Sequence, residues 1–325
     1  MAPMKSSDGR NVGKLVAVYK NRFLGGSVSG DTPPLASGPI TATGGNVYTP
    51  GDGYKYHVFT NSMNGTATGI FTQSAGGDRV DALIVGGGGG GGTGYYAGGG
   101  GAGGILEGVI PQHQPGNYVV TVGAGGNGST SASVPGNKAT NGGNSTFGDD
   151  VTAFGGGSGG SGPGIDDNGG DGGSGGGASY YAYPGAGTAL ASPAPSDYTA
   201  HGNDAAASRG GSSSTIGAGG GGAGAIGSGV AGGAGEPFSA FPGSKIPILG
   251  PLSASMGPNY DIYAGGGGGA SPSGGTGGVG GGGSGGTSTS AGSGIDLLGG
   301  GGGGTNNPGT GGAGGDGIVI IRYAV

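Results

Sequence analysis

The stretch Leu83-Ile84-Val85 runs directly into Gly86-Gly87-Gly88-Gly89-Gly90-Gly91-Gly92, seven consecutive glycines. Glycine blocks then recur, so that tracts lie at about 86–104, 155–178, 217–235, 265–286 and 299–317. A second apolar run, Ile318-Val319-Ile320-Ile321, follows the last tract. The fold must therefore explain why five glycine tracts lie between two strand-like runs.

The composition limits the kinds of protein that this chain can form. Glycine supplies 100 of the 325 residues, against about 7% in an average protein. A flexible linker or disordered chain is one alternative, but only 9% of the residues are charged and the apolar residues are grouped between the tracts. Collagen needs glycine at every third position and much more proline than the 19 residues present. The pattern favours an ordered glycine fold other than collagen.

Charge and hydropathy argue against several partners. The net charge is -6, and no basic patch is evident, so we expect no nucleic-acid partner. No apolar stretch is long enough to span a membrane. The first residues, Met1-Ala2-Pro3-Met4-Lys5, do not resemble a signal peptide. We therefore expect neither membrane insertion nor signal-directed export.

The glycine blocks predict extended helices of the polyglycine-II type. A threefold helix of this kind rises about 3.1 Å per residue and has no internal hydrogen bonds, so its N–H and C=O groups point outward. Glycine keeps the N–H that proline lacks, and the missing Cβ lets backbones approach closely. Ordering glycine is entropically costly. We therefore expect nearly every backbone group in the tracts to bond to a neighbouring helix.

Short runs of aromatic and β-branched residues outside the tracts predict strands. The predicted strands are 54–60, 66–72, 80–85, 105–110, 118–122, 145–147 and 151–154, with a polar loop after 122. Several short strands joined by turn signals are typical of a β-sandwich or jelly roll. Residues 317–325 are expected to pair near residues 80–85 and close the domain. The predicted fold is all-β, with a β-sandwich or jelly-roll-like base, a polyglycine-II bundle and essentially no α-helix.

This reading divides the chain into four parts. They are an N-terminal attachment arm at 1–45, a β-rich domain with the first glycine tract at 46–154, a polyglycine-II bundle with aromatic loops at 155–316, and a closing strand at 317–325. The first part holds five of the eleven basic residues. It could be a frayed tail or an arm that orders on a partner protein. Our candidates for that contact are Lys14, Leu15, Val16, Val18, Tyr19, Lys20, Arg22 and Phe23.

Five stretches together carry a family resemblance. They are 54–59, 80–86, Gly116-Asn117-Tyr118-Val119-Val120-Thr121-Val122-Gly123-Ala124-Gly125-Gly126, Asn144-Ser145-Thr146-Phe147-Gly148 and 317–323. Over residues 46–325 the chain resembles the glycine-rich domain proteins of marine and cyanobacterial phages, which look like virion structural or tail-fibre proteins. The bundle is also similar to polyglycine-II adhesins at the fibre tips of T-even-like phages, and more remotely to the glycine-rich ectodomain of anaplastic-lymphoma-kinase-type receptors. The β-rich first half departs from the adhesins.

The resemblance implies a non-enzymatic virion protein that assembles in the host cytoplasm and is released by lysis. Its expected role is host attachment as part of a tail fibre, with other virion proteins as partners and a host glycan or outer-membrane protein as a further partner. A capsid decoration or head-fibre protein is the first alternative. A secreted glycine-rich matrix or filament protein is the second. A homo-oligomer is compatible with each of these roles.

Motifs that could carry chemistry are explained by the abundance of glycine. G-x-G-x-x-G recurs, for example within 86–92, but no helical pattern follows it. Residues 156–160 fit G-x-S-x-G, yet none of the three histidines, His57, His113 and His201, lies in a triad context. Residues 311–318 match a single calcium-binding nonapeptide. We interpret an acidic cluster at 166–171 as a solvated loop, and a calcium site is the alternative. We expect no enzyme activity, cofactor or metal.

The aromatic side chains beside the tracts are the best candidates for recognition. They are Tyr95, Tyr96, Tyr180, Tyr181, Tyr183, Tyr198, Phe238, Phe241, Tyr260 and Tyr263. One interpretation is that they cap the ends of a bundle that has no hydrophobic core of its own. The other is that they form a recognition surface for glycans or proteins at the loop tips. The sequence leaves both open.

Overall fold

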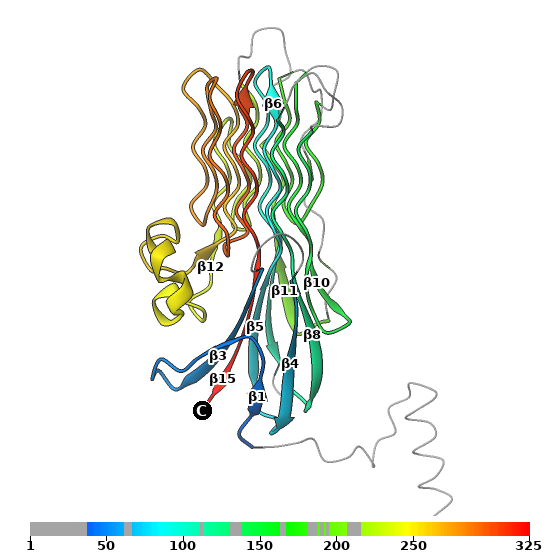
Figure 1. Cartoon of the computed structure of the whole chain (residues 1–325), viewed down its shortest axis with the longest axis vertical. Coiled ribbons are helices and arrows are strands. Elements are labelled where there is room, and N and C mark those ends of the chain that lie inside the picture. The colour runs from blue at the N-terminus through cyan, green and yellow to red at the C-terminus, as the bar shows by residue number, and fades with distance from the viewer. Residues whose placement is uncertain are drawn as a thin grey trace, which may run out of the picture.

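The computed structural model describes residues 38–61, 67–110, 113–130, 138–162, 167–180, 187–188, 192, 195–206 and 216–325. Figure 1 shows a long molecule with two parts. Strands form a sandwich at one end, here called the base. Extended segments run away from it side by side and form the other part, here called the bundle. The end of the bundle farthest from the base is called the tip.

The base consists of two antiparallel sheets. One has the strand order β1-β4-β8-β9-β10 and the other β11-β7-β5-β15-β3-β2. Their strands are β1 Thr41–Thr43, β2 Asn46–Tyr48, β3 Tyr54–Thr60, β4 Ala67–Ala75, β5 Val80–Val85, β7 Ile105–Ile110, β8 Gly116–Val122, β9 Ser145–Phe147, β10 Val151–Ala153, β11 Tyr198–His201 and β15 Ile318–Ala324. The all-β prediction is confirmed.

The last strand lies inside the six-stranded sheet. β15 pairs with β5 on one side, where Ile320 faces Leu83, and with β3 on the other, where Ile320 faces Val58. The predicted pairing of the closing strand with residues 80–85 is therefore confirmed. Every residue of β5 is buried, which explains why Ala82 to Val85 are all apolar, because a strand covered on both faces needs no polar alternation.

Two hydrophobic clusters cover the two faces of this sheet. The cluster between the sheets includes Phe71, Ile84 and Val319. The second cluster lies on the outer face, where the segment 236–264 packs against the sheet. That segment contains β12 Glu236–Pro237, the 3₁₀ turns η2 Gly243–Lys245 and η3 Pro247–Ser255, and β13 Ile262–Tyr263. It lies beside the base in Figure 1, coloured yellow.

The bundle is organised around the tract 86–92. Its N–H groups donate to three neighbouring tracts in rotation, at N···O distances of 2.8–3.0 Å. Residues 86, 89 and 92 donate to residues 104, 101 and 98; residues 87 and 90 to 143 and 140; and residues 88 and 91 to 315 and 312. Each neighbour is reached at every third residue, so the helix has three residues per turn. This is the polyglycine-II pattern that the sequence predicts.

The carbonyl groups of the same tract bond to three further neighbours. Carbonyls 87 and 90 accept from residues 156 and 159, carbonyls 88 and 91 from 126 and 129, and carbonyls 89 and 92 from 302 and 305. The residue order shows that the three accepting neighbours run antiparallel to the tract and the three donating neighbours run parallel to it. The central helix therefore has six neighbours, with partners for every N–H from 86 to 92 and every carbonyl from 87 to 92.

Two details differ from the prediction. The glycine tracts are not single rods: 86–104 reverses near residues 93–97, so that Gly92 donates to Gly98. The predicted polar loop after residue 122 instead supplies two bundle helices, near 123–130 and 138–144. Asn127 and Thr130 in the first helix, and Asn141 and Asn144 in the second, are exposed and three positions apart, which keeps each pair on the outer side of a threefold helix. Base and bundle are consequently interleaved along the chain.

Candidate functional site

The aromatic candidates fall into separate regions of the molecule. Phe238, Phe241 and Tyr263 are 3%, 0% and 0% exposed and belong to the outer-face cluster of the base. Burial raises the pKa of the Tyr263 hydroxyl, which donates to the carbonyl of Phe241 at 2.6 Å. The prediction that these three lie on a recognition surface is wrong, because the segment 236–264 covers the sheet rather than emerging at the tip.

Tyr198 and Tyr260 also lie away from the tip. Tyr198 starts β11 and faces Gly108 of β7, where a Cβ would overlap its ring. Burial raises the pKa of the Tyr198 hydroxyl, so this side chain is part of the packing of the sheet edge. Tyr260 belongs to the segment beside the base and is 41% exposed. Tyr181 and Tyr183 lie outside the described residues.

The tip is built where two tracts reverse. β6 Thr93–Gly94 pairs in parallel with β14 Thr305–Asn306, and Figure 1 shows β6 at the end of the bundle opposite the base. The N–H of Tyr96 donates to the side-chain oxygen of Asn306 at 2.8 Å. The N–H of Asn307 donates to the carbonyl of Gly94 at 3.0 Å. The two turns are therefore fixed to one another.

Three tyrosines of the described ranges meet at this tip. The rings of Tyr95 and Tyr96 lie edge to face with centroids 5.3 Å apart, and those of Tyr96 and Tyr180 also meet edge to face at 6.1 Å. The N–H of Tyr180 donates to the carbonyl of Tyr96 at 3.1 Å. Tyr95 is 60% exposed. Tyr96 has a φ of 50°, a left-handed backbone that its bond to Asn306 helps to hold.

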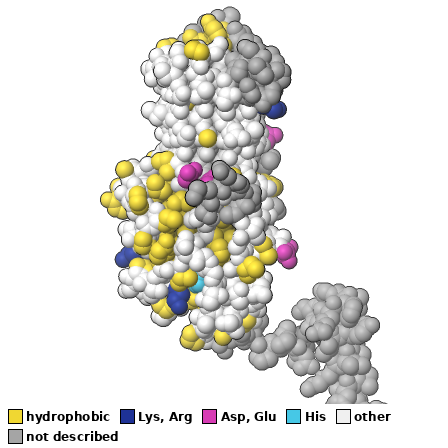
Figure 2. Space-filling view, in the orientation of Figure 1, with side chains coloured by type: hydrophobic (Ala, Val, Ile, Leu, Met, Phe, Trp, Pro, Cys, Tyr) yellow, Lys and Arg dark blue, Asp and Glu magenta, His cyan; other side chains and the backbone are white. Residues whose placement is uncertain are grey.

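A cavity of about 300 Å³ lies at the tip and is lined by Gly94, Tyr95, Tyr96, Asn306 and Asn307. Among the residues that the structure describes, the lining side chains are phenols and amides, without a carboxylate, an imidazole or a basic group. Such a lining can stack on a ligand and form hydrogen bonds with it. Figure 2 shows hydrophobic side chains at this end of the molecule.

The two asparagines were missed by the sequence reasoning. They interrupt the last glycine tract as Asn306-Asn307-Pro308, much as Tyr95-Tyr96 interrupts the first one. Matching interruptions in two tracts were the available signal, because residues that break neighbouring tracts can meet where the tracts turn. Their meeting could not be derived without knowing which tracts are neighbours.

Two of the three histidines are structural. The Nδ1–H of His57 donates to the carbonyl of Gly44 at 2.7 Å, and its Nε2 accepts from the hydroxyl of Tyr323 at 3.1 Å. His113 bonds through Nδ1 to the side-chain oxygen of Gln73 at 2.5 Å. Burial lowers the pKa of both rings, to about 4 for His113. Neither faces a nucleophile that it could activate in these contacts.

The acidic residues form local contacts. Asp171 accepts from the N–H and the hydroxyl of Thr188, which lowers its pKa, and Asp167 accepts from the hydroxyl of Ser179 at 3.1 Å. Within the described ranges, no group of three or more His, Asp or Glu residues is placed to hold a metal ion. The same part of the chain contains no helix of the length and hydropathy needed to cross a membrane.

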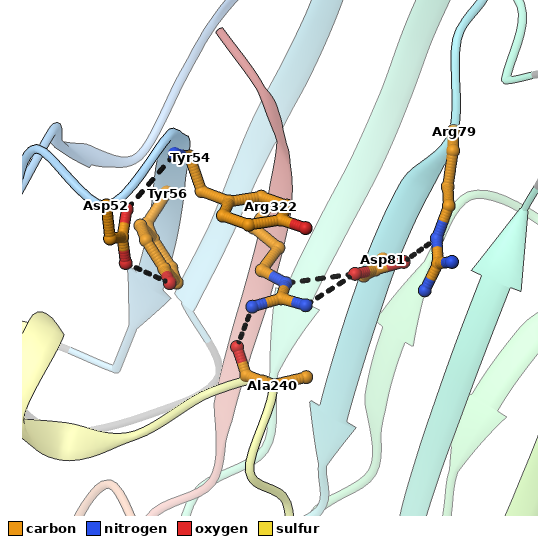
Figure 3. Close-up of polar contacts among 7 residues, drawn as sticks. All are labelled: Asp52, Tyr54, Tyr56, Arg79, Asp81, Ala240 and Arg322. Atoms are coloured by element: carbon orange, nitrogen blue, oxygen red, sulfur yellow. Dashed lines mark hydrogen bonds and ion pairs between the residues drawn. The ribbon is translucent and has the colours of Figure 1, made fainter.

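A buried charge cluster fastens the segment 236–264 to the base (Figure 3). Arg322 donates to Asp81 at 2.8 and 2.9 Å and also to the carbonyl of Ala240. Its guanidinium lies 4.2 Å from the centre of the Tyr54 ring. The signal in the sequence was a single charge in each of two apolar strands, Asp81 in β5 and Arg322 in β15.

The predicted arm contacts, Lys14 to Phe23, lie outside the described residues. A family model described as a glycine-rich domain matches residues 60–324. The match extends from the end of β3 to the end of β15, so it includes strands of the base, the bundle and the tip. A comparison with curated proteins found no match. Because the family model matches most of its length, the chain belongs to the glycine-rich domain family.

Proposed function

We propose that this protein is a non-enzymatic virion component, associated with a tail fibre, that binds the host surface through its tip. The supporting observation is the cluster of Tyr95, Tyr96 and Tyr180 at the end of the bundle, of which Tyr95 and Tyr96 line a cavity. Tyrosine combines a flat apolar face with a polar group and loses little entropy on binding. The two hydrogen-bonded turns beneath Tyr95 and Tyr96 hold these rings in place. Rings that are already ordered lose less entropy on binding a ligand than rings on a flexible loop.

The separation of the base from the tip by the bundle supports separate roles for the two ends of the molecule. The first described residue, Gly38, precedes β1 of the base, whereas the tyrosine cluster lies at the tip. A hydrogen-bonded bundle between them acts as a rigid spacer. In this proposal the preceding residues, with Lys14, Leu15, Val16, Val18, Tyr19, Lys20, Arg22 and Phe23 as contacts, attach the protein to other virion proteins.

Particle adsorption tests the recognition role. Tyr95→Ser and Tyr180→Ser remove tip rings, whereas Tyr260→Ser removes an exposed ring beside the base and serves as the control. We expect the tip variants to lose adsorption to host cells at unchanged incorporation and melting temperature, and the control to keep it. Normal adsorption of the tip variants, with altered particle stability, would instead favour a decoration or head-fibre protein.

Assembly tests the attachment role. A chain that starts at Gly38 retains every described strand, so we expect it to fold with an unchanged melting temperature. It should fail to enter particles because the contacts supplied by the preceding residues are missing. Incorporation at the normal level would show that these residues are not an attachment arm.

A further inference from the structure

We propose that the tip cavity binds an uncharged sugar unit, with Tyr95 as the stacking platform and the amide of Asn306 as a hydrogen-bond donor. This inference rests on the proposed recognition role and specifies the chemistry of its ligand. It concerns the cavity lined by Gly94, Tyr95, Tyr96, Asn306 and Asn307.

The lining residues that belong to the described ranges have no charged group that could pair with an ionic ligand. Within these ranges the lining carries no carboxylate, ammonium or guanidinium group. A phosphate, sulfate or carboxylate that entered the cavity would lose water without gaining an opposite charge, and such desolvation is costly. Neutral hydroxyl groups lose less on entry and can recover hydrogen bonds from amides and phenols. The lining therefore fits a ligand that is rich in hydroxyls and has no net charge.

The geometry of the tyrosines supplies an apolar face for a sugar ring. The ring of Tyr95 is at 89° to that of Tyr96 and 60% exposed. Tyr96 supports it from the side and is fixed in turn by its backbone bond to Asn306. An exposed aromatic ring held by its neighbours can pack against the C–H groups of a sugar without first being ordered.

The side-chain amide of Asn306 supplies hydrogen-bond donors for the hydroxyl groups of the sugar. Its side-chain oxygen accepts the N–H of Tyr96 at 2.8 Å, which determines where the amide nitrogen points. That nitrogen carries two N–H donors, and a sugar hydroxyl can accept from either. The cavity of about 300 Å³ is at the small end of the range for ligand sites. It is therefore suited to one terminal sugar unit.

The test uses the full chain and an array of oligosaccharides that end in neutral hexoses or N-acetylhexosamines, with sialylated and sulfated versions of the same chains. We expect binding to the neutral set and at least tenfold weaker binding to the charged versions. A soluble neutral oligosaccharide from the array should compete. Preferential binding to the charged chains, or no binding to any of them, would overturn the inference.

Two substitutions connect the binding to the cavity. Asn306→Asp preserves the oxygen that accepts from Tyr96 but removes both N–H donors and adds a negative charge, so it should reduce binding about tenfold or more. Tyr95→Ser should do the same, while Tyr95→Phe and the distant Tyr260→Ser should retain binding. Retained binding in both Asn306→Asp and Tyr95→Ser would place the sugar elsewhere. Loss of adsorption in tip variants without any glycan binding would overturn the sugar ligand and leave the recognition role intact.

Discussion

At the scale of single residues, glycine is required in the bundle because it has no Cβ. Gly88 and Gly91 of the central tract show the reason, since a Cβ on either would overlap the carbonyl of a neighbouring tract, that of Gly300 or Gly303. Neither glycine has a positive φ. Glycine is therefore needed at these positions because the helices lie so close together. Any side chain that points inward would separate two hydrogen-bonded backbones.

The residues Ala313 and Gly314 allow this to be tested at adjacent positions. Ala313 is exposed, whereas a Cβ on Gly314 would meet the carbonyl of Gly88. We expect Gly314→Val to destabilise the protein by roughly 2–4 kcal/mol, because several hydrogen bonds worth about 1 kcal/mol each are disturbed. Ala313→Val should cost less than about 0.5 kcal/mol. Equal melting temperatures for the two variants in calorimetry would contradict a close-packed bundle.

The buried histidines predict a loss of stability in acid. Because the pKa of His113 falls from 6.5 to about 4 on folding, the unfolded chain binds more protons than the folded one between these values. Stability should therefore decline as the pH falls from about 6.5 to 4, by on the order of 3 kcal/mol for this residue. Urea unfolding at a series of pH values measures the decline. His113→Gln should flatten it, and an equally steep decline in that variant would show that other groups cause it.

At the scale of elements, the two parts of the molecule satisfy their backbones in different ways. A strand of the base bonds to two neighbours in a sheet, whereas the central tract bonds to six. At the surface of the bundle, side chains take over the role of missing neighbours: Asn144 and Asn141 accept the N–H groups of Gly155 and Ser158. Their spacing of three matches the spacing of those N–H groups, which explains why asparagine recurs there.

Hydrogen exchange distinguishes this bundle from a flexible glycine linker. The amides of 86–92, and those of the tracts 217–235 and 265–286, should exchange far more slowly than amides in a coil because neighbouring tracts accept them. The exposed turn residues Gly51 and Gly53 provide the comparison. Mass spectrometry or NMR can measure the rates. Exchange in the tracts as fast as at Gly51 would contradict hydrogen bonding between the tracts.

The charge cluster of Arg322 and Asp81 should hold the segment 236–264 against the base. The Asp81 side chain is 5% exposed, so Arg322→Met leaves a buried carboxylate with Arg79, whose side chain is 62% exposed. We expect a loss of about 3–5 kcal/mol, partly recovered when Asp81→Asn is added. Arg79→Met should cost less than about 1 kcal/mol. Urea unfolding of these three variants and of Asp81→Asn alone measures the coupling, and additive effects of the Arg322 and Asp81 substitutions would argue against it.

Much of this architecture could be predicted from local patterns, since the runs 54–60, 80–85 and 105–110 match β3, β5 and β7. β11 is absent from the predicted strands because its pairing with β7 is long-range and its four residues are too few to show alternation. Phe238, Phe241 and Tyr263 are candidates in the sequence both for capping the bundle and for recognition, because aromatics in a loop look alike whether they bind a ligand or cover a sheet. At the tip, the sequence analysis identified the tyrosines but not the asparagines. The two sets come from tracts that are distant in the sequence, so their contact could not be predicted.

At the scale of the whole molecule, the hydrogen bonds connect distant parts of the chain. The central tract donates to residues 312 and 315, and the six-stranded sheet contains β15 between β5 and β3. Arg322 and Asp81, which link two of these strands, are 241 positions apart. Neither the middle of the sheet nor the middle of the bundle is complete without the segment 311–324.

This connectivity has a consequence for folding kinetics. A ribosome makes the chain from its N-terminus, so residues 86–92 must wait for almost the whole sequence before their last partners emerge. Folding dominated by such distant contacts is slow, because loops have to close before the contacts that stabilise them can form. The central helix and β5 therefore become protected late and together, after residues 311–324 have left the ribosome, and the nascent chain has to remain unaggregated until then.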